Sequence, residues 1–157
     1  MADIWTFAFN FVLSFLATMG FAVIYNAPKR ELINCGIAGA LGWVVYFYIM
    51  GETTNSTLSV FGGSIVVSAC SRVLSYTRRA PSTLFLIPGI IPLVPGYPMY
   101  NTMLAMIEQD LYHSYLEGVG TLQMAGAIAI GIVFIFSLPY RAFAWVAPKD
   151  ERKKRKK

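Results

Sequence analysis

The stretch Pro-Gly-Ile-Ile-Pro-Leu-Val-Pro-Gly-Tyr-Pro, residues 88–98, places four prolines inside an apolar segment. Each proline removes a backbone donor and clashes with the preceding helical turn. The carbonyl groups that lose their usual helical partners are those of Leu84, Pro88, Ile91 and Val94. Lipid tails cannot donate hydrogen bonds to these carbonyl groups, so neighbouring helices, water or a bound solute must do so. The pattern is typical of the broken helices of membrane transporters.

The composition of the chain also indicates a membrane protein. Of its 157 residues, 56% are hydrophobic and 13% are charged, and the mean hydropathy is +0.56. Soluble domains average about 25% charged residues, so the expected fold class is an all-α polytopic membrane protein. We expect a single membrane domain over residues 1–147, followed by a basic tail over residues 148–157.

Five segments are apolar and long enough to span about 30 Å of hydrocarbon as helices. They cover residues 4–25, 32–50, 58–76, 84–107 and 120–146. The fourth contains the proline-glycine stretch and is expected to be broken, either kinked or re-entrant. The first carries Asp3 where a signal peptide has basic residues, so we expect it to be a retained helix.

Charges alternate between the connectors of these segments. Basic residues follow the first, third and fifth segments, at Lys29, Arg30, Arg78, Arg79, Arg141 and in the tail. The two intervening connectors carry no Lys or Arg, and their charged residues are all acidic, namely Glu52, Glu108, Asp110 and Glu117. Because cytoplasmic loops accumulate Lys and Arg, the N-terminus is expected outside and the C-terminus inside.

The basic tail admits two interpretations, binding to anionic lipid or binding to nucleic acid. A basic run directly after a final membrane helix mostly anchors the topology. We therefore expect contact with membrane lipid and no nucleic-acid partner.

Polar residues inside the predicted helices form stripes at helical spacing. One stripe holds Asn10, Ser14 and Thr18, and another holds Ser64, Ser68, Ser71, Arg72 and Ser75. Small residues form two further ridges, Cys35 with Gly39 and Gly42, and Gln123 with Ala127 and Gly131. An Asn amide or a guanidinium is costly against lipid, so the polar stripes are expected to face the protein interior or a cavity. Close helix packing with polar contacts is the simpler interpretation for single Ser and Gly positions.

Arg72 lies inside the third segment, about one and a half turns before Arg78 and Arg79. Two interpretations remain open for its side chain. Its head group extends to the inner interface, or it pairs with a substrate carboxylate on the cytoplasmic side of the site.

A new helical stretch is expected to start at Met99, after the last breaker, Pro98. Free N–H groups at such a start attract anions, so it is a candidate carboxylate site. Asn101 and Thr102 are the side-chain donors placed to add specificity. A kinked or re-entrant helix without a ligand is the alternative.

The sequence lacks several kinds of chemistry. No Asp or Glu lies in the middle of a predicted span, so the coupling group that a proton-driven carrier commonly uses is missing. His113, the single His, lies in a connector with Glu108 and Asp110. There is no catalytic constellation, no metal-ligand spacing and no phosphate-binding loop, so we expect neither an enzyme nor a cofactor. The missing carboxylate suggests a partner subunit.

The segment from Ile87 to Gly96, followed by Tyr100, resembles the signature of the threonine/serine exporter family in its C-terminal membrane domain. Residues 20–28 with Arg30, and then residues 36–42, are similar to the first hairpin of the same domain. In that family the small domain and a larger polytopic one are fused or form separate chains. The resemblance implies a two-component exporter in a bacterial inner membrane, with the larger subunit as partner.

Threonine and serine are the first expected substrates of such an exporter, and dicarboxylates such as succinate are the alternative. A membrane scaffold or assembly subunit without transport is the interpretation of another class. Fourteen residues are expected to line a substrate path: Asn10, Ser14, Ser64, Ser68, Arg72, Pro88, Gly89, Pro92, Pro95, Gly96, Tyr97, Tyr100, Asn101 and Thr102.

Overall fold

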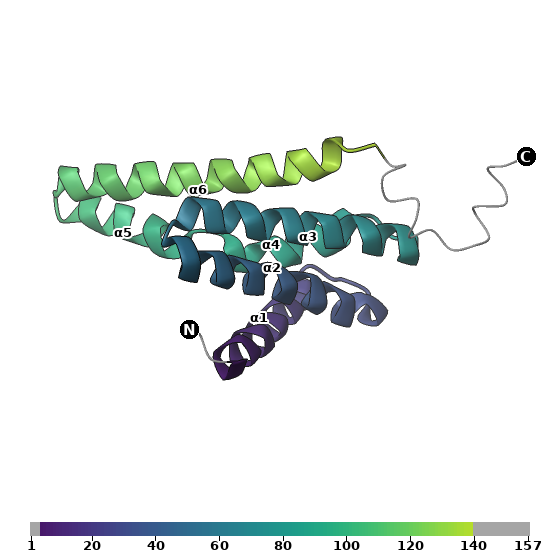
Figure 1. Ribbon diagram of the computed structural model, residues 1–157. Helices are drawn as coiled ribbons and strands as arrows, with labels where there is room; N and C mark the ends of the chain where they lie inside the picture. The colour runs from purple at the N-terminus through teal and green to yellow at the C-terminus, as the bar shows by residue number, and fades with distance from the viewer. Residues whose placement is uncertain (1–3, 140–157) are drawn as a thin grey trace, which may run out of the picture.

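The computed structural model describes residues 4–139, and every element in that range is a helix (Figure 1). The α-helices are α1 (Ile4–Ile24), α2 (Leu32–Thr53), α3 (Ser56–Arg78), α4 (Thr83–Ile90), α5 (Gly96–Ile107) and α6 (Leu111–Ser137). Two short 3-10 helices are η1 (Lys29–Glu31) and η2 (Ile91–Leu93). The first three predicted spans match α1, α2 and α3 to within three residues at each end. Arg141 and the basic tail lie outside the described residues.

Four stretches are long and apolar enough to cross a membrane, namely Trp5–Ile24, Lys29–Thr53, Ser56–Arg78 and Leu111–Ser137. The stretches Thr83–Leu93 and Gly96–Ile107 meet this standard only as a pair, and they are bent by 53° relative to each other. Length and composition therefore give four or five crossings. The described part of the chain is all-helical, and the chain is a multi-pass membrane protein.

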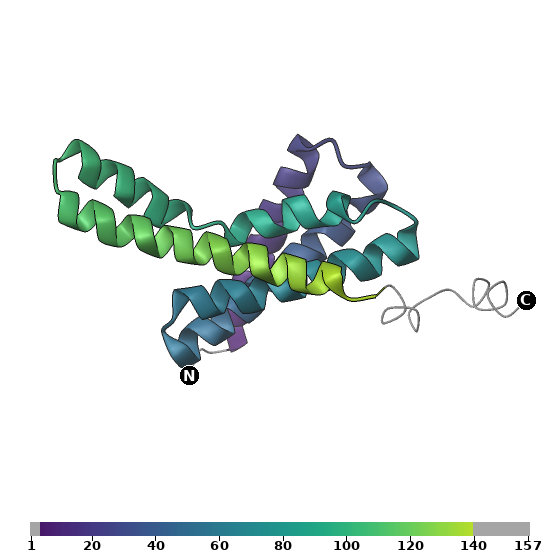
Figure 2. The same ribbon diagram turned by 90° about the horizontal axis from the view of Figure 1, so that it is seen from above.

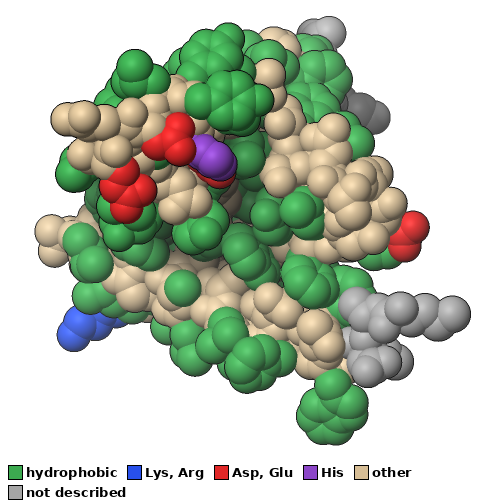
Figure 3. Space-filling model, turned by 90° about the vertical axis from the view of Figure 1, so that its left-hand side faces the viewer, with side chains coloured by type: hydrophobic (Ala, Val, Ile, Leu, Met, Phe, Trp, Pro, Cys, Tyr) green, Lys and Arg blue, Asp and Glu red, His purple; other side chains and the backbone are tan. Residues whose placement is uncertain are grey.

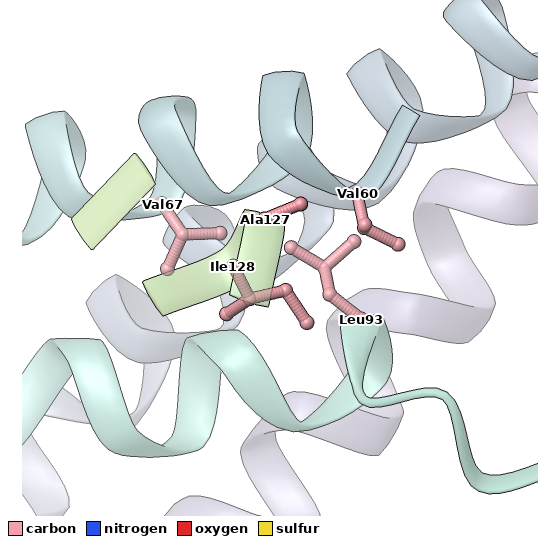
Figure 4. Packing of buried hydrophobic residues seen from close by; sticks show 5 residues of the cluster. All are labelled: Val60, Val67, Leu93, Ala127 and Ile128. Atoms are coloured by element: carbon pink, nitrogen blue, oxygen red, sulfur yellow. The ribbon is translucent and has the colours of Figure 1, made fainter. Parts of the chain in front are cut away.

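The buried core lies where α3, η2 and α6 meet. Five side chains point toward one another there (Figure 4): Val60, Val67, Leu93, Ala127 and Ile128. Lipid tails are as apolar as these side chains, so close packing rather than escape from water favours this association inside a membrane.

Glycine residues set the separation of the core helices. A Cβ atom on Gly42 of α2 would collide with Val67 of α3, and one on Gly89 of α4 would lie 2.9 Å from the same side chain. A Cβ atom on Gly131 of α6 would collide with the Ser64 hydroxyl. The small residues predicted to form ridges at Gly42 and Gly131 therefore lie in close helix contacts.

The helix α5 and the first half of α6 form a hairpin that projects from the rest of the molecule (Figures 1 and 2). The Ser114 hydroxyl donates to the Thr102 carbonyl at 3.2 Å across this hairpin, and Gly118 also lies beside Thr102. Large side chains with exposed fractions of 63–79% cover its outer surface: Tyr97, Tyr100, Met103, Ile107, Leu111, Tyr112 and Tyr115.

The last helix begins at Leu111, nine residues before the predicted start of the fifth segment at Gly120. The Asp110 side chain caps it by accepting a hydrogen bond from the His113 backbone N–H at 3.0 Å. Charged residues such as Glu117 limit an apolar stretch, but they do not end a helix. The 27 residues of α6 make a helix of about 40 Å, longer than the hydrocarbon core. The predicted end at residue 146 lies outside the described residues.

The helices beside the proline-glycine stretch also differ from expectation. α4 continues through Pro88 to Ile90, so this proline does not end the helix. α5 begins at Gly96, three residues before the predicted start at Met99. Pro98 is the third residue of α5, a position where a backbone N–H has no partner within the helix. The missing N–H of the proline therefore costs no helical hydrogen bond.

Candidate functional site

The backbone between η2 and α5 turns without a regular helical pattern. The Val94 N–H donates to the Ile91 carbonyl at 3.1 Å, and the Gly96 N–H donates to the Val94 carbonyl at 2.7 Å. The Cys35 thiol of α2 donates to the Leu84 carbonyl at 3.5 Å. Protein groups therefore bond three of the four carbonyls that the prolines were predicted to leave without helical partners.

A cavity of about 290 Å³ opens beside this turn, and we call it the break cavity. Its lining residues are Trp43, Tyr46, Ser56, Val60, Pro92, Leu93, Val94, Pro95, Gly96, Tyr97, Pro98 and Met124. The Trp43 and Tyr46 rings form an aromatic wall, with centroids 5.0 Å apart. None of the lining residues is charged. The volume is close to the lower end of the range for small-molecule sites.

The first turn of α5 offers fewer free donors than expected for an anion site. The Gly96 N–H is bonded to Val94, the Met99 N–H is bonded to the Pro95 carbonyl at 3.1 Å, and Pro98 has no N–H. Within the described residues, the Tyr97 N–H has no hydrogen-bond partner. A single backbone donor therefore remains for an anion at this helix start.

A second cavity, of about 250 Å³, also borders Trp43, and we call it the α1 cavity. It is lined by Asn10, Leu13, Ser14, Ala17, Trp43 and Pro92. The Asn10 side chain accepts a hydrogen bond from the Trp43 indole N–H at 3.1 Å and donates to the Thr6 carbonyl at 2.8 Å. The polar stripe of α1 therefore faces a cavity, as the sequence predicted for Asn10 and Ser14.

A third cavity, of about 300 Å³, lies at the hairpin formed by α5 and α6. It is lined by Asn101, Leu104, Ala105, Glu108, Asp110, His113 and Glu117. Acidic side chains gather around the histidine on this face of the molecule (Figure 3). The His113 backbone N–H, followed by its ring, holds the pKa of the Asp110 carboxyl below its usual value.

The two side chains predicted to add specificity at the start of α5 lie away from the break cavity. Asn101 lines the third cavity, and the Thr102 hydroxyl donates to the Pro98 carbonyl of its own helix at 2.7 Å. Tyr100 is 63% exposed on the surface of the hairpin. These three residues therefore do not share a site with the turn.

The serine stripe of α3 is buried in helix contacts. The Ser64 hydroxyl donates to the Phe61 carbonyl at 2.8 Å, and Ser71 donates to the Val67 carbonyl at 2.7 Å. Ser68 is fully buried, and its hydroxyl has no hydrogen-bond partner among the described residues. Ser64 and Ser68 lie outside the lining of all three cavities.

Arg72 reaches across to the end of α6. Its guanidinium donates to the carbonyls of Ile135 and Leu138, each at 2.8 Å, and lies 5.2 Å from the centre of the Phe136 ring. Ile135 is eleven positions beyond Met124 of the break cavity, or about 16 Å along the helix. Arg72 therefore binds the carbonyl groups at the C-terminus of α6, a role that neither sequence interpretation anticipated.

The structure divides the predicted path residues into groups. Pro92, Pro95, Gly96 and Tyr97 line the break cavity, while Asn10 and Ser14 line the α1 cavity. Pro88 and Gly89 are buried in α4, where Gly89 packs against Val67. Pro92 lines both cavities and joins the first two groups.

The sequence pattern did not predict Trp43, Tyr46 or Met124 as site residues. Trp43 and Tyr46 lie three positions apart and so share one face of α2. In an apolar span, however, an aromatic pair at this spacing is indistinguishable from ordinary packing. Within residues 4–139, no group of three or more His, Cys, Asp or Glu side chains could hold a metal ion.

Comparison with known sequences gives a family assignment. The family model described as "Threonine/Serine exporter, ThrE" matches residues 10–138, which include α2 to α6 and most of α1. The chain belongs to the threonine/serine exporter family. The resemblance to this family that the proline-glycine stretch indicated is thereby confirmed.

The chain is similar to an uncharacterized protein of Haemophilus influenzae, to which it is 25% identical over 141 residues. The match covers 85% of this chain and 48% of the relative, so the chain spans about half the length of that protein. No solved structure matches the chain.

Proposed function

We propose that this chain is the smaller unit of a two-component secondary exporter in a bacterial inner membrane, and that the break cavity holds its substrate. The observation that carries this proposal is the cavity itself. It is formed by irregular backbone at the proline-glycine turn, in a chain of an exporter family. Irregular backbone inside a membrane is tolerated where it lines a cavity or is covered by protein.

The proposed topology follows from this placement of the turn. α4, η2 and α5 form one broken span, so the chain crosses the membrane five times with the N-terminus outside. Glu52 then lies on the outer side with the acidic end of the hairpin, while Lys29, Arg30, Arg78 and Arg79 lie on the cytoplasmic side.

A larger polytopic subunit of the same family is the proposed partner. Two observations support this. About half of the Haemophilus influenzae relative lies outside the match. The break cavity has no carboxylate or histidine in its lining, so proton coupling requires a group from elsewhere.

Small metabolites that carry a carboxylate, with threonine and serine first, are the proposed substrates. In this proposal the Tyr97 N–H would bind one carboxylate oxygen, and the Trp43 and Tyr46 rings would offer π faces to an ammonium group. Threonine and serine are zwitterions, so the ammonium group balances the charge of the carboxylate within the same molecule. A dicarboxylate such as succinate would need its positive charges from the partner, because no Lys or Arg lines this cavity.

The test is efflux of labelled threonine, serine and succinate from cells or vesicles that contain the chain and its partner. Gly96→Val places a side chain in the break cavity, where a Cβ atom meets nothing within 4 Å, so folding is preserved while the cavity shrinks. Gly126→Val is the matched control, because a Cβ atom there also meets nothing within 4 Å and the residue lines none of the three cavities.

Loss of efflux in Gly96→Val with normal efflux in Gly126→Val is the expected result. Pro95→Ala, which restores an N–H at the turn, should likewise stop efflux while membrane insertion stays intact. Normal efflux in Gly96→Val and Pro95→Ala would exclude the break cavity as the substrate site. The same result, combined with retained partner binding, would favour a scaffold role.

A further inference from the structure

Two separate cavities in this structure share a wall. Trp43 and Pro92 line both the break cavity and the α1 cavity. Pro92 is part of the backbone turn, whereas the Trp43 side chain is a single ring system on one helix. Because the ring belongs to both linings, a change in its position would alter the separation between the two cavities.

The position of Trp43 places this wall at mid-depth. Trp43 lies at the middle of α2, whose 22 residues run from Leu32 to Thr53. The break cavity lies toward the C-terminal end of α2, since it includes Tyr46 and also Ser56 at the start of α3. The α1 cavity reaches Ala17, which is nearer the C-terminal end of α1 and therefore beside the first half of α2.

A hydrogen bond fixes the ring in its present position. The indole N–H donates to the Asn10 Oδ1 at 3.1 Å. Asn10 is itself oriented, because its Nδ2 donates to the Thr6 carbonyl at 2.8 Å. The amide oxygen therefore points at Trp43, and the bond acts as a latch between α1 and α2.

We propose that Trp43 is the gate between the two halves of a substrate path, and that Asn10 is the positioning residue that holds the gate closed. This inference rests on the proposed transport function for its biological meaning. The gate itself is a property of the two cavities. In this role Asn10 acts by positioning Trp43 and not by contact with substrate.

The gate is tested by thiol labelling of the full chain with its partner in native membrane vesicles. The background carries Cys35→Ser and Cys70→Ala, and Ser14→Cys places one thiol at a buried position of the α1 cavity. A charged, water-soluble methanethiosulfonate is added on the side onto which the break cavity opens. Ser56→Cys, in the break cavity, and Leu16→Cys, on the exposed face of α1, are the matched controls.

Asn10→Leu removes the latch with a side chain of similar size, and Trp43→Phe removes it with a smaller ring. Asn10→Leu is expected to raise the labelling rate of Ser14→Cys by about fivefold, the effect of losing one net hydrogen bond on an open–closed equilibrium, and Trp43→Phe should raise it by at least as much. Asn10→Leu added to Trp43→Phe should not raise the rate further, because the bond is already absent. Labelling of Ser56→Cys should not change.

Unchanged labelling of Ser14→Cys in both latch variants would overturn the gate. An equal rise at Leu16→Cys would overturn it too, since that result means general loosening of α1. The labelling needs no substrate, so absence of efflux would count against the proposed function and leave the gate result standing. In a chain that does export threonine, Asn10→Leu should alter the maximal efflux rate more than the substrate concentration at half-maximal rate.

Discussion

The Cys35 thiol donates to the Leu84 carbonyl at 3.5 Å and thereby joins α2 to α4 across 49 positions of sequence. Leu84 lies four residues before Pro88, so its carbonyl is the one that the proline deprives of a helical N–H. A small polarizable side chain from a neighbouring helix thus allows α4 to continue through a proline.

Loss of this contact should weaken the protein measurably. Cys35→Val removes the donor and adds a methyl group at a fully buried position, so we expect the free energy of unfolding to fall by about 1 kcal/mol or more. Denaturant unfolding in detergent measures this change, with Cys35→Ser as the variant that keeps a donor. In a Pro88→Ala background residue 88 supplies its own N–H, and the Cys35→Val effect should shrink. An undiminished effect there would mean that Cys35 acts through packing alone.

Arg72 should matter for stability and not for substrate affinity. Its guanidinium bonds the Ile135 and Leu138 carbonyls, and hydrogen bonds to charged groups contribute about 1.5–3 kcal/mol each. Arg72→Leu should therefore lower the unfolding free energy by about 2 kcal/mol or more. Any efflux that remains should keep the threonine concentration at half-maximal rate. A large rise in that concentration would instead place Arg72 at the substrate.

The contact between α3 and α6 should not tolerate a methyl group at Gly131. A Cβ atom there collides with the Ser64 hydroxyl, and overpacking of this kind costs about 1–3 kcal/mol. Gly131→Ala should lower the melting temperature in detergent, whereas Gly126→Ala, with open space around its Cβ, should not. Ser64→Ala should restore part of the loss, because it removes the colliding oxygen. Equal melting temperatures for the two glycine variants would contradict the helix separation described above.

The start of α6 should loosen in acid. The pKa of Asp110 is lowered in the folded chain, so its capping contribution is complete above the usual carboxyl pKa of 3.8. That contribution is lost as the pH falls through the lower folded value. Hydrogen exchange of the amides at Leu111 to Ser114, corrected for intrinsic rates, should therefore show falling protection in that pH range. Asp110→Asn keeps a capping oxygen that does not titrate, and a fall of the same size in that variant would exclude Asp110 as the cause.

Much of the fold could be predicted because hydropathy and helical spacing are local properties. They identified α1, α2 and α3 and the stripes on them. The predicted start of the last helix is wrong, because a hydropathy pattern assigns the acidic residues between Glu108 and Glu117 to a loop. Charge limits how far a segment lies in lipid, but the N-cap at Asp110 decides where the helix begins.

The candidate site was only partly predictable. The prolines showed that carbonyl groups such as that of Leu84 would need partners, but the partner, Cys35, lies on another helix. Asn10 was expected to face inward, yet nothing local identifies Trp43 as the group that it binds. Partners across helices depend on crossing angles and on glycine contacts, which a single sequence does not specify.

One valine fixes the relative position of three helices. Val67 of α3 presents one methyl group to Gly42 and the other to Gly89, so α2 and α4 abut the same side chain. Tightly packed helices with a common contact cannot slide independently. A conformational change that keeps these contacts would therefore move α2, α3 and α4 together, while the hairpin of α5 and the first half of α6 projects beyond them (Figure 1).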